Sequence, residues 1–158
     1  MKSVKFILSL VLLLAMILSF NSCHQGPIYE KTLKMKNSIW DRFDQKLFEI
    51  PIEETGKSYD ISLVASNTNQ FPYDNLPVYV IITTTSGEER MREITLPVRE
   101  NGKMLGLAKG NTWEVSTVLW RNISMADKGK CKISIENMIP KIQTEGIAEI
   151  GIVVEKSK

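Results

Sequence analysis

Short segments in which apolar and polar residues alternate restrict this chain to β structure. Residues 59–65 show the pattern most clearly, because an apolar side chain occupies every odd position. A period of two places successive side chains on opposite faces of a strand. Residues 78–85 are rich in β-branched side chains, which fit a pleated surface. Further segments that we predict as strands lie at 90–98, 113–120, 130–136 and 147–155.

Turn-forming residues separate these segments about every 10 to 15 residues. Asn101-Gly102 is the strongest of these signals, since both residues tolerate positive φ. Residues 86–89 and 127–129 have similar turn chemistry, and we expect Gly102, Gly106 and Gly110 to serve turns or bulges. Short strands with regularly spaced turns are typical of sandwiches. We therefore predict an all-β fold, a single β-sandwich with the jelly roll as its specific variant.

Residues 39–48 (IWDRFDQKLF) are the one stretch that fits two structures. Apolar residues at 39, 40, 43, 47 and 48 are compatible with two or three helical turns. The same stretch is also compatible with an edge strand. The sequence leaves this choice open.

The amino terminus has the layout of an export signal. Lys2 and Lys5 precede an apolar run of about 15 residues, 6–20, which is shorter than the roughly 20 residues that a membrane-spanning helix needs. Ser22 and Cys23 follow, and this ending resembles a lipobox, in which the cysteine is acylated and becomes the mature N-terminus. An ordinary signal peptide or an uncleaved anchor is the alternative. We predict a lipoprotein signal peptide at 1–22, a lipidated Cys23 with a short tether at 23–30, and the β-sandwich at 31–158.

Charge argues against nucleic acid as a partner. The chain has 20 Lys and Arg and 18 Asp and Glu, and two of the lysines lie in the predicted signal. A balanced mature surface favours neither nucleic acid nor a polybasic membrane patch. We therefore expect the membrane to be bound through the lipid on Cys23 rather than through charge.

Catalytic patterns are scarce in this sequence. The single histidine, His24, is adjacent to Cys23, and Cys131 shares its strand face with isoleucines, as buried cysteines usually do. Metal-ligand spacings and nucleotide-binding glycine motifs are missing. The neighbouring acids Asp41 and Asp44, Glu53-Glu54 and Glu88-Glu89 stand in polar, turn-like settings unsuited to a general acid. We predict neither enzyme activity nor a cofactor; acids brought together from distant strands are the alternative.

One cluster of aromatic and polar residues could contact a ligand or partner. Residues 71–77 (FPYDNLP) precede the most apolar strand, and Tyr73, Asp74 and Asn75 could stack on and hydrogen-bond a sugar, together with Trp40 or Trp113. In the alternative interpretation, Tyr73 packs across the mouth of the sandwich while Asp74 and Asn75 hydrogen-bond the turn backbone. Glycan or partner contact and a structural role both remain open.

These residues also resemble a known family. Trp40 in the first mature segment, FPYDNL at 71–76, and Gly146-Ile147 followed by Ile150-Gly151 are similar, in that order, to the GldH family of gliding-motility lipoproteins of the Bacteroidetes. The resemblance implies a palmitate-bearing envelope lipoprotein linked to gliding and, through it, to type IX secretion, with protein partners and no catalytic residue. In these bacteria an acidic cluster after the lipidated cysteine directs lipoproteins to the cell surface. None follows Cys23, so we expect an outer-membrane lipoprotein on the periplasmic face.

Overall fold

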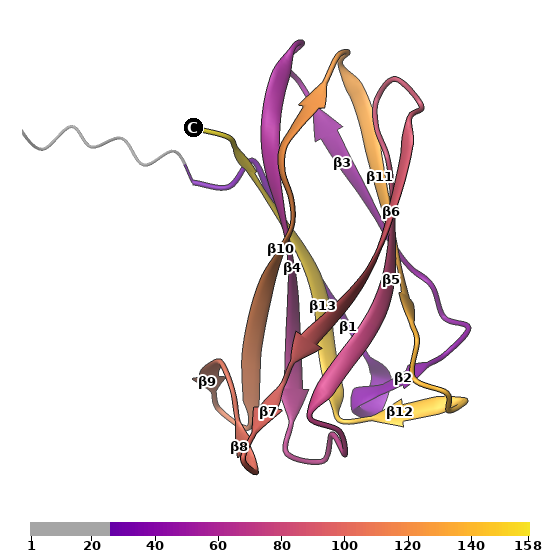
Figure 1. Ribbon diagram of the computed structural model, residues 1–158, viewed down its shortest axis with the longest axis vertical. Coiled ribbons are helices and arrows are strands. Elements are labelled where there is room, and N and C mark those ends of the chain that lie inside the picture. The colour runs from indigo at the N-terminus through magenta and orange to yellow at the C-terminus, as the bar shows by residue number, and fades with distance from the viewer. Residues whose placement is uncertain (1–25) are drawn as a thin grey trace, which may run out of the picture.

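Two antiparallel sheets packed face to face make up the body of the protein (Figure 1). The computed structural model describes residues 26–158. The predicted signal peptide, Cys23 and His24 lie outside these described residues. The first strand begins at Tyr29, so the sandwich starts slightly before residue 31. Within residues 26–158, no helix is long and apolar enough to span a bilayer.

The first sheet has five strands in the order β1-β13-β4-β10-β9. Its central strand β4 pairs with β13 on one side and β10 on the other. The bounds are β1 (Tyr29–Lys34), β4 (Lys57–Thr68), β9 (Leu107–Lys109), β10 (Thr112–Met125) and β13 (Ile147–Lys156).

The second sheet has four strands in the order β3-β11-β5-β6. Two short ribbons, β2 with β12 and β7 with β8, extend from the end of the sandwich opposite the chain termini (Figure 1). The bounds are β2 (Ile39–Asp41), β3 (Lys46–Ile52), β5 (Asn75–Thr83), β6 (Glu89–Pro97), β7 (Arg99–Glu100), β8 (Lys103–Met104), β11 (Gly129–Asn137) and β12 (Gln143–Glu145).

The strand order is that of a jelly roll. Leaving aside the short β9, the sheets β1-β13-β4-β10 and β3-β11-β5-β6 each contain four long strands. At the two sides of the sandwich, β1 lies against β3 and β10 lies against β6. The chain crosses repeatedly from one sheet to the other, as in a double-sheet jelly roll. The predicted all-β sandwich is confirmed, and so is its jelly-roll variant.

The core is built from the inward positions of the alternating segments. On β4 the side chains of Tyr59, Ile61, Leu63 and Ala65 are all buried. Isoleucines and valines of β5 and β11 face them across the sandwich, together with Cys131, and those of β13 lie beside them in the same sheet. The predicted hydrophobic alternation therefore sets which face of each strand is inside.

Residues 39–48 form strands rather than a helix. They contribute β2 and the start of β3, with a turn between them and a short 3-10 turn, Lys36–Ser38, before them. Trp40 is fully buried and its strand pairs with Thr144 of β12. Beyond residue 46 the burial alternates with a period of two, because Phe48, Ile50 and Ile52 face the core. Pairing with β12 and β11 therefore outweighs the helical spacing of the stretch.

Two glycines of the carboxy-terminal segment are required by close packing. Gly146 has φ +81°, and a Cβ there would lie 2.1 Å from the backbone nitrogen of Phe71. A Cβ on Gly151 would lie 2.6 Å from Cγ2 of Thr32 on the neighbouring strand β1. Asn101 and Gly102 both have positive φ, which confirms the predicted turn between β7 and β8.

Candidate functional site

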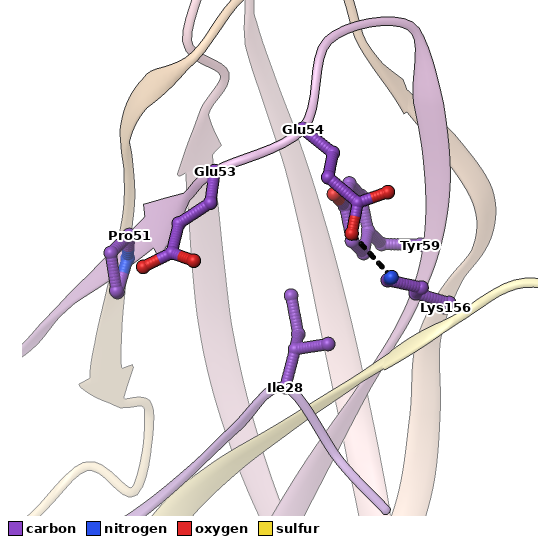
Figure 2. A pocket seen from close by; sticks show the side chains of 6 residues that line it. All are labelled: Ile28, Pro51, Glu53, Glu54, Tyr59 and Lys156. Atoms are coloured by element: carbon purple, nitrogen blue, oxygen red, sulfur yellow. Dashed lines mark hydrogen bonds and ion pairs between the residues drawn. The ribbon is translucent and has the colours of Figure 1, made fainter. Parts of the chain in front are cut away.

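The amino-terminal chain joins the sandwich at the same end as the carboxy terminus. The backbone N–H of Ile28 donates to the carbonyl of Val154 at 2.8 Å, immediately before β1 pairs with β13. Figure 2 shows a small hollow beside this junction, about 160 Å³ in volume, with Glu54 and Lys156 paired at its edge. It is lined by Ile28, Pro51, Glu53, Glu54, Tyr59 and Lys156. The described chain therefore enters the domain at this end.

Ion pairs and hydrogen bonds fasten the carboxy-terminal tail here. A hydrogen bond from Lys156 lowers the pKa of Glu54, and the same contact raises the pKa of Lys156. Asp60 of β4 accepts hydrogen bonds from the Ser157 hydroxyl at 2.6 Å and from the Asn122 N–H at 2.8 Å. These two bonds, with Arg121 nearby, lower the pKa of Asp60. Charged contacts thus hold the last strand to the junction where the N-terminus enters.

The cluster at 71–77 lies at the opposite end, in the loop between β4 and β5 (Figure 1). β4 has 12 residues, so the two ends are about 40 Å apart at 3.3–3.4 Å per residue. The carbonyl of Asp74 accepts the N–H groups of Val98 and Arg99, at 2.8 and 2.9 Å. The Arg99 guanidinium donates to the carbonyl of Phe71 at 2.7 Å. The loop is therefore held to the chain after β6 by backbone oxygens.

The residues predicted to contact a ligand do not share one exposed surface. Trp40 has no exposed surface, and its Nε1 donates to the carbonyl of Asp44 at 2.8 Å. Tyr73 is half-buried against the core, with the Phe71 ring edge-on at 5.7 Å and the Lys141 ammonium 5.6 Å from its ring centre. Trp113 is also half-buried, on β10 opposite Asn67. A stacking platform that includes Trp40 is not available in this conformation.

Asp74 and Asn75 are exposed. The structural alternative assigned the turn hydrogen bonds to their side chains. Instead, the backbone carbonyl of Asp74 accepts the bonds that fix the loop. A carbonyl oxygen is present at every residue, so no side-chain pattern in the sequence could have identified this acceptor.

The candidate reactive groups lie in unreactive settings. Cys131 is fully buried, and this burial raises the pKa of its thiol to about 12. One member of each pair of neighbouring acids is ion-paired on the surface: Asp44 with Lys46, Glu54 with Lys156, and Glu88 with Arg90. The contact with Arg90 lowers the pKa of Glu88, whereas a general acid needs a raised one. Among residues 26–158, no three His, Cys, Asp or Glu side chains group in a way that could hold a metal ion.

Sequence reasoning missed the outer face of the four-stranded sheet. Leu47 and Met91 are 62% and 60% exposed although they belong to regular strands. Leu47 alternates with core residues along β3, and Met91 is the register partner of Ile81, which alternates with core residues along β5. This alternation is the signal that the sequence did contain. The spatial relation of Leu47 and Met91 depends on strand order, which alternation alone does not provide.

Comparison with known proteins identifies a family. The profile described as GldH lipoprotein matches residues 27–154. "Gliding motility lipoprotein GldH" of Flavobacterium johnsoniae is 27% identical over 154 residues, covering 92% of this chain and 94% of the relative. "Gliding motility lipoprotein GldH homolog" of Christiangramia forsetii is 26% identical over 149 residues, covering 89% and 91%.

Solved structures show more distant likenesses. TmCBM61 in complex with β-1,4-galactotriose is 10% identical, with a TM-score of 0.38, and covers 84% of this chain and 92% of that one. A structure of infectious bursal disease virus, Gx strain, is 14% identical, with a TM-score of 0.31, and covers 82% and 29%. At these TM-scores neither likeness bears on what this chain binds.

Proposed function

This chain belongs to the GldH lipoprotein family, and from that premise we propose that it is a non-enzymatic component of an outer-membrane assembly for gliding motility and type IX secretion. It is anchored through an acylated Cys23. Its sandwich holds a fixed place among protein partners. No nucleic acid or cofactor takes part.

The way the chain enters the sandwich is the observation that carries this proposal. Ile28 is hydrogen-bonded to β13, and it lies only five positions after Cys23. At 3.3–3.6 Å per residue, that tether reaches at most about 18 Å. A lipid on Cys23 therefore keeps one end of the sandwich close to the bilayer and leaves the opposite end and both outer faces available to other proteins. Two or three acyl chains supply the firm hold, at about 0.8 kcal/mol for each buried methylene.

A scaffold role agrees with the chemistry of the described residues. Cys131 is sealed in the core, and each carboxyl group with a shifted pKa has it lowered rather than raised. Such groups are ionised at neutral pH and suit surface ion pairs. A membrane anchor raises the local concentration of partners, so contacts of modest affinity are enough for assembly.

We place the sandwich on the periplasmic side. The residues after Cys23 are His24, Gln25, Gly26 and Pro27, and none of them is acidic. Density-gradient separation of the two membranes, followed by protease treatment of intact and permeabilised cells, tests this. Digestion only after permeabilisation is expected; digestion in intact cells would place the domain on the cell surface.

The central experiment replaces Cys23 by Ala in the full chain, expressed in a strain that lacks the wild-type gene. We expect the mature protein to lose the mass of its acyl groups, to leave the outer-membrane fraction, and to lose colony spreading and adhesin export. Ser22→Ala is the matched control, because it keeps a small residue before the cysteine and should keep the lipid. Globomycin, which blocks lipoprotein signal cleavage, should leave an unprocessed precursor of the wild type. Unchanged fractionation and unchanged phenotype in Cys23→Ala would refute the proposal.

A further inference from the structure

An apolar row crosses the outer face of the four-stranded sheet. Leu47 of β3, Ser134 of β11, Ile81 of β5 and Met91 of β6 are consecutive partners in the strand register. Leu47, Ser134 and Ile81 alternate with buried residues, so their side chains point away from the core, and Met91 lies on the same face as the register partner of Ile81. Strands are 4.7–4.9 Å apart, and the row therefore spans about 15 Å. Its two ends are more than half exposed.

The row is hollowed at its centre. Ser134 is much smaller than its neighbours Leu47 and Ile81, and a depression of about 310 Å³ lies over it. Lys132, Thr83 and Glu49 also line this depression. A hollow with apolar walls and a polar rim fits the anchor side chain of a protein partner.

A second hollow follows along the same face, toward the end with the short ribbons. It measures about 450 Å³ and is lined by Arg42, Phe43, Tyr79, Glu136, Asn137 and Met138. Phe43 is 85% exposed. Glu136 accepts a hydrogen bond from Gln45 at 2.7 Å, and Gln45 also lines the first hollow. The two hollows are thus neighbours, and an extended segment could place one side chain in each.

The charge of this face is uneven. The outward positions of β5 and β6 include Glu89 and Glu93 but no Lys or Arg. Neither glutamate forms an ion pair with any residue in 26–158. The two arginines of β6 face the other way: Arg90 pairs with Glu88, and Arg92 lies over Trp120, 5.5 Å from the ring centre. The cations of this face lie away from β6: Lys130 is paired with Glu49, Lys132 lines the first hollow and Arg42 lines the second.

We propose that the outer face of the four-stranded sheet is a docking surface for a protein segment that inserts apolar side chains into the two hollows and pairs Lys or Arg with Glu89 and Glu93. This inference rests on the proposed function and specifies where a partner binds. Apolar anchors in pockets supply most of the affinity, and complementary charge at the edge selects and steers the partner.

Other occupants suit the face less well. A second copy packed about a two-fold axis beside β6 would bring its own Glu89 and Glu93 near these two, and like charges oppose that pairing. A second copy turned so that its Lys132 meets these glutamates is an outcome that the cross-linking test below distinguishes. An anionic lipid headgroup would meet the same repulsion. A basic and apolar peptide segment is complementary to both features.

The test uses the full lipidated chain in cells. A diazirine amino acid replaces Met91, at the β6 end of the row, or Ser116 on the opposite sheet as the control position. We expect a position-91 cross-link to one protein, with the cross-linked peptide mapped by mass spectrometry to an apolar segment containing Lys or Arg. Ser134→Trp fills the first hollow, and Glu89→Lys with Glu93→Lys reverses the charge. Each should lower the cross-link yield at least tenfold.

Matched controls lie on the other sheet. Ser116→Trp makes the same size change, and Glu30→Lys with Glu155→Lys makes the same charge change; both should leave the cross-link intact. A cross-link to a second copy, to lipid or to a segment without basic residues overturns the inference, as does no cross-link or a yield unaffected by the face variants. If one of these results is obtained while Cys23→Ala still abolishes spreading, the proposed docking surface is wrong and the proposed function stands. If Cys23→Ala has no effect, the proposed function itself fails.

Discussion

The two outer faces of the sandwich are built differently although they cover the same core. The four-stranded sheet presents the row of Leu47, Ser134, Ile81 and Met91. At a comparable position the five-stranded sheet presents Thr32, Gly151, Val64 and Ser116, which are all small. Neither choice is demanded by the core, because outward positions do not contact it. The difference therefore lies in what each face meets outside the sandwich.

Polar groups follow the same division. On the five-stranded face, Asp60 is satisfied by Ser157 and Asn122, and Glu114 is paired with Lys109 at 2.7 Å. On the other face, Glu89 and Glu93 form no ion pair within the described residues. The division is one of degree, because Glu30 and Glu155 of the five-stranded face also form no ion pair within residues 26–158. The four-stranded face, however, sets its unpaired glutamates beside a row of large apolar side chains, as interaction surfaces do.

The largest expected effect is a difference in cysteine reactivity between the core side of β11 and the two outer faces. We predict that maleimide modifies Cys131 roughly a thousandfold or more slowly than Ser116→Cys or Ser134→Cys in the detergent-solubilised protein. The Cys131 thiol is fully buried and its pKa is raised to about 12, so it reacts only after the sandwich opens, which costs several kcal/mol. Mass spectrometry over time measures the rates, and urea should abolish the difference. Rapid labelling of Cys131 in the folded protein would mean that this sheet is not closed over the core.

A second prediction concerns the close contact between β13 and β1 in the five-stranded sheet. Gly151→Val should lower the free energy of unfolding by about 2–3 kcal/mol, because its Cβ would collide with Thr32 Cγ2 and the carbonyl of Lys31. Valine favours strands, so a loss despite that preference must come from the collision with β1. Urea unfolding followed by tryptophan fluorescence measures it. Destabilisation below about 0.5 kcal/mol would show that β1 moves aside without cost.

The sequence predicts the inside of this molecule better than its outside. Alternation at 59–65 and at 130–136 identified the core positions of β4 and β11, since one buried face is enough to set a strand's pattern. Residues 39–48 could not be assigned, because their strands depend on partners about 90 to 100 residues away. The apolar row was not predictable either: Leu47, Ile81 and Met91 become neighbours only through the order β3-β11-β5-β6. Within its own segment, each of the three is a single apolar residue at a position where the alternation predicts a polar one.

The third prediction uses pH on the five-stranded face. The hydrogen bonds from Ser157 and Asn122 lower the folded-state pKa of Asp60 below its ordinary value of 3.8. Its contribution to stability is therefore complete above that value and is lost as the pH falls through the folded-state pKa. Asp60→Asn should cost about 1 kcal/mol at pH 7 and less at pH 3, since hydrogen bonds to a charged acceptor are the stronger ones. Urea titrations at both pH values measure this.

Glu93→Gln is the matched variant on the four-stranded face. Glu93 has no ion-pair partner in residues 26–158, so we expect its replacement to change stability by less than about 0.5 kcal/mol at either pH. An equal, pH-independent loss in both variants would contradict the contrast between satisfied and uncompensated charge on the two faces.

The smallest expected effect is the most specific to the four-stranded face. Ser134→Val adds a β-branched side chain at the centre of the row, in a hollow of about 310 Å³ that has room for it. We expect the free energy of unfolding to change by no more than about 0.5 kcal/mol, whereas the same valine at Gly151 costs several times as much. Urea unfolding of the two variants side by side makes the comparison. The same urea measurement is made on Ser134→Trp. If its free energy of unfolding is also unchanged, a loss of cross-linking in Ser134→Trp reflects the filled hollow and not a weakened fold. A Ser134→Val variant destabilised as much as Gly151→Val would instead mean that this hollow is filled in the folded protein, and both outer faces would then be closed surfaces of the same kind.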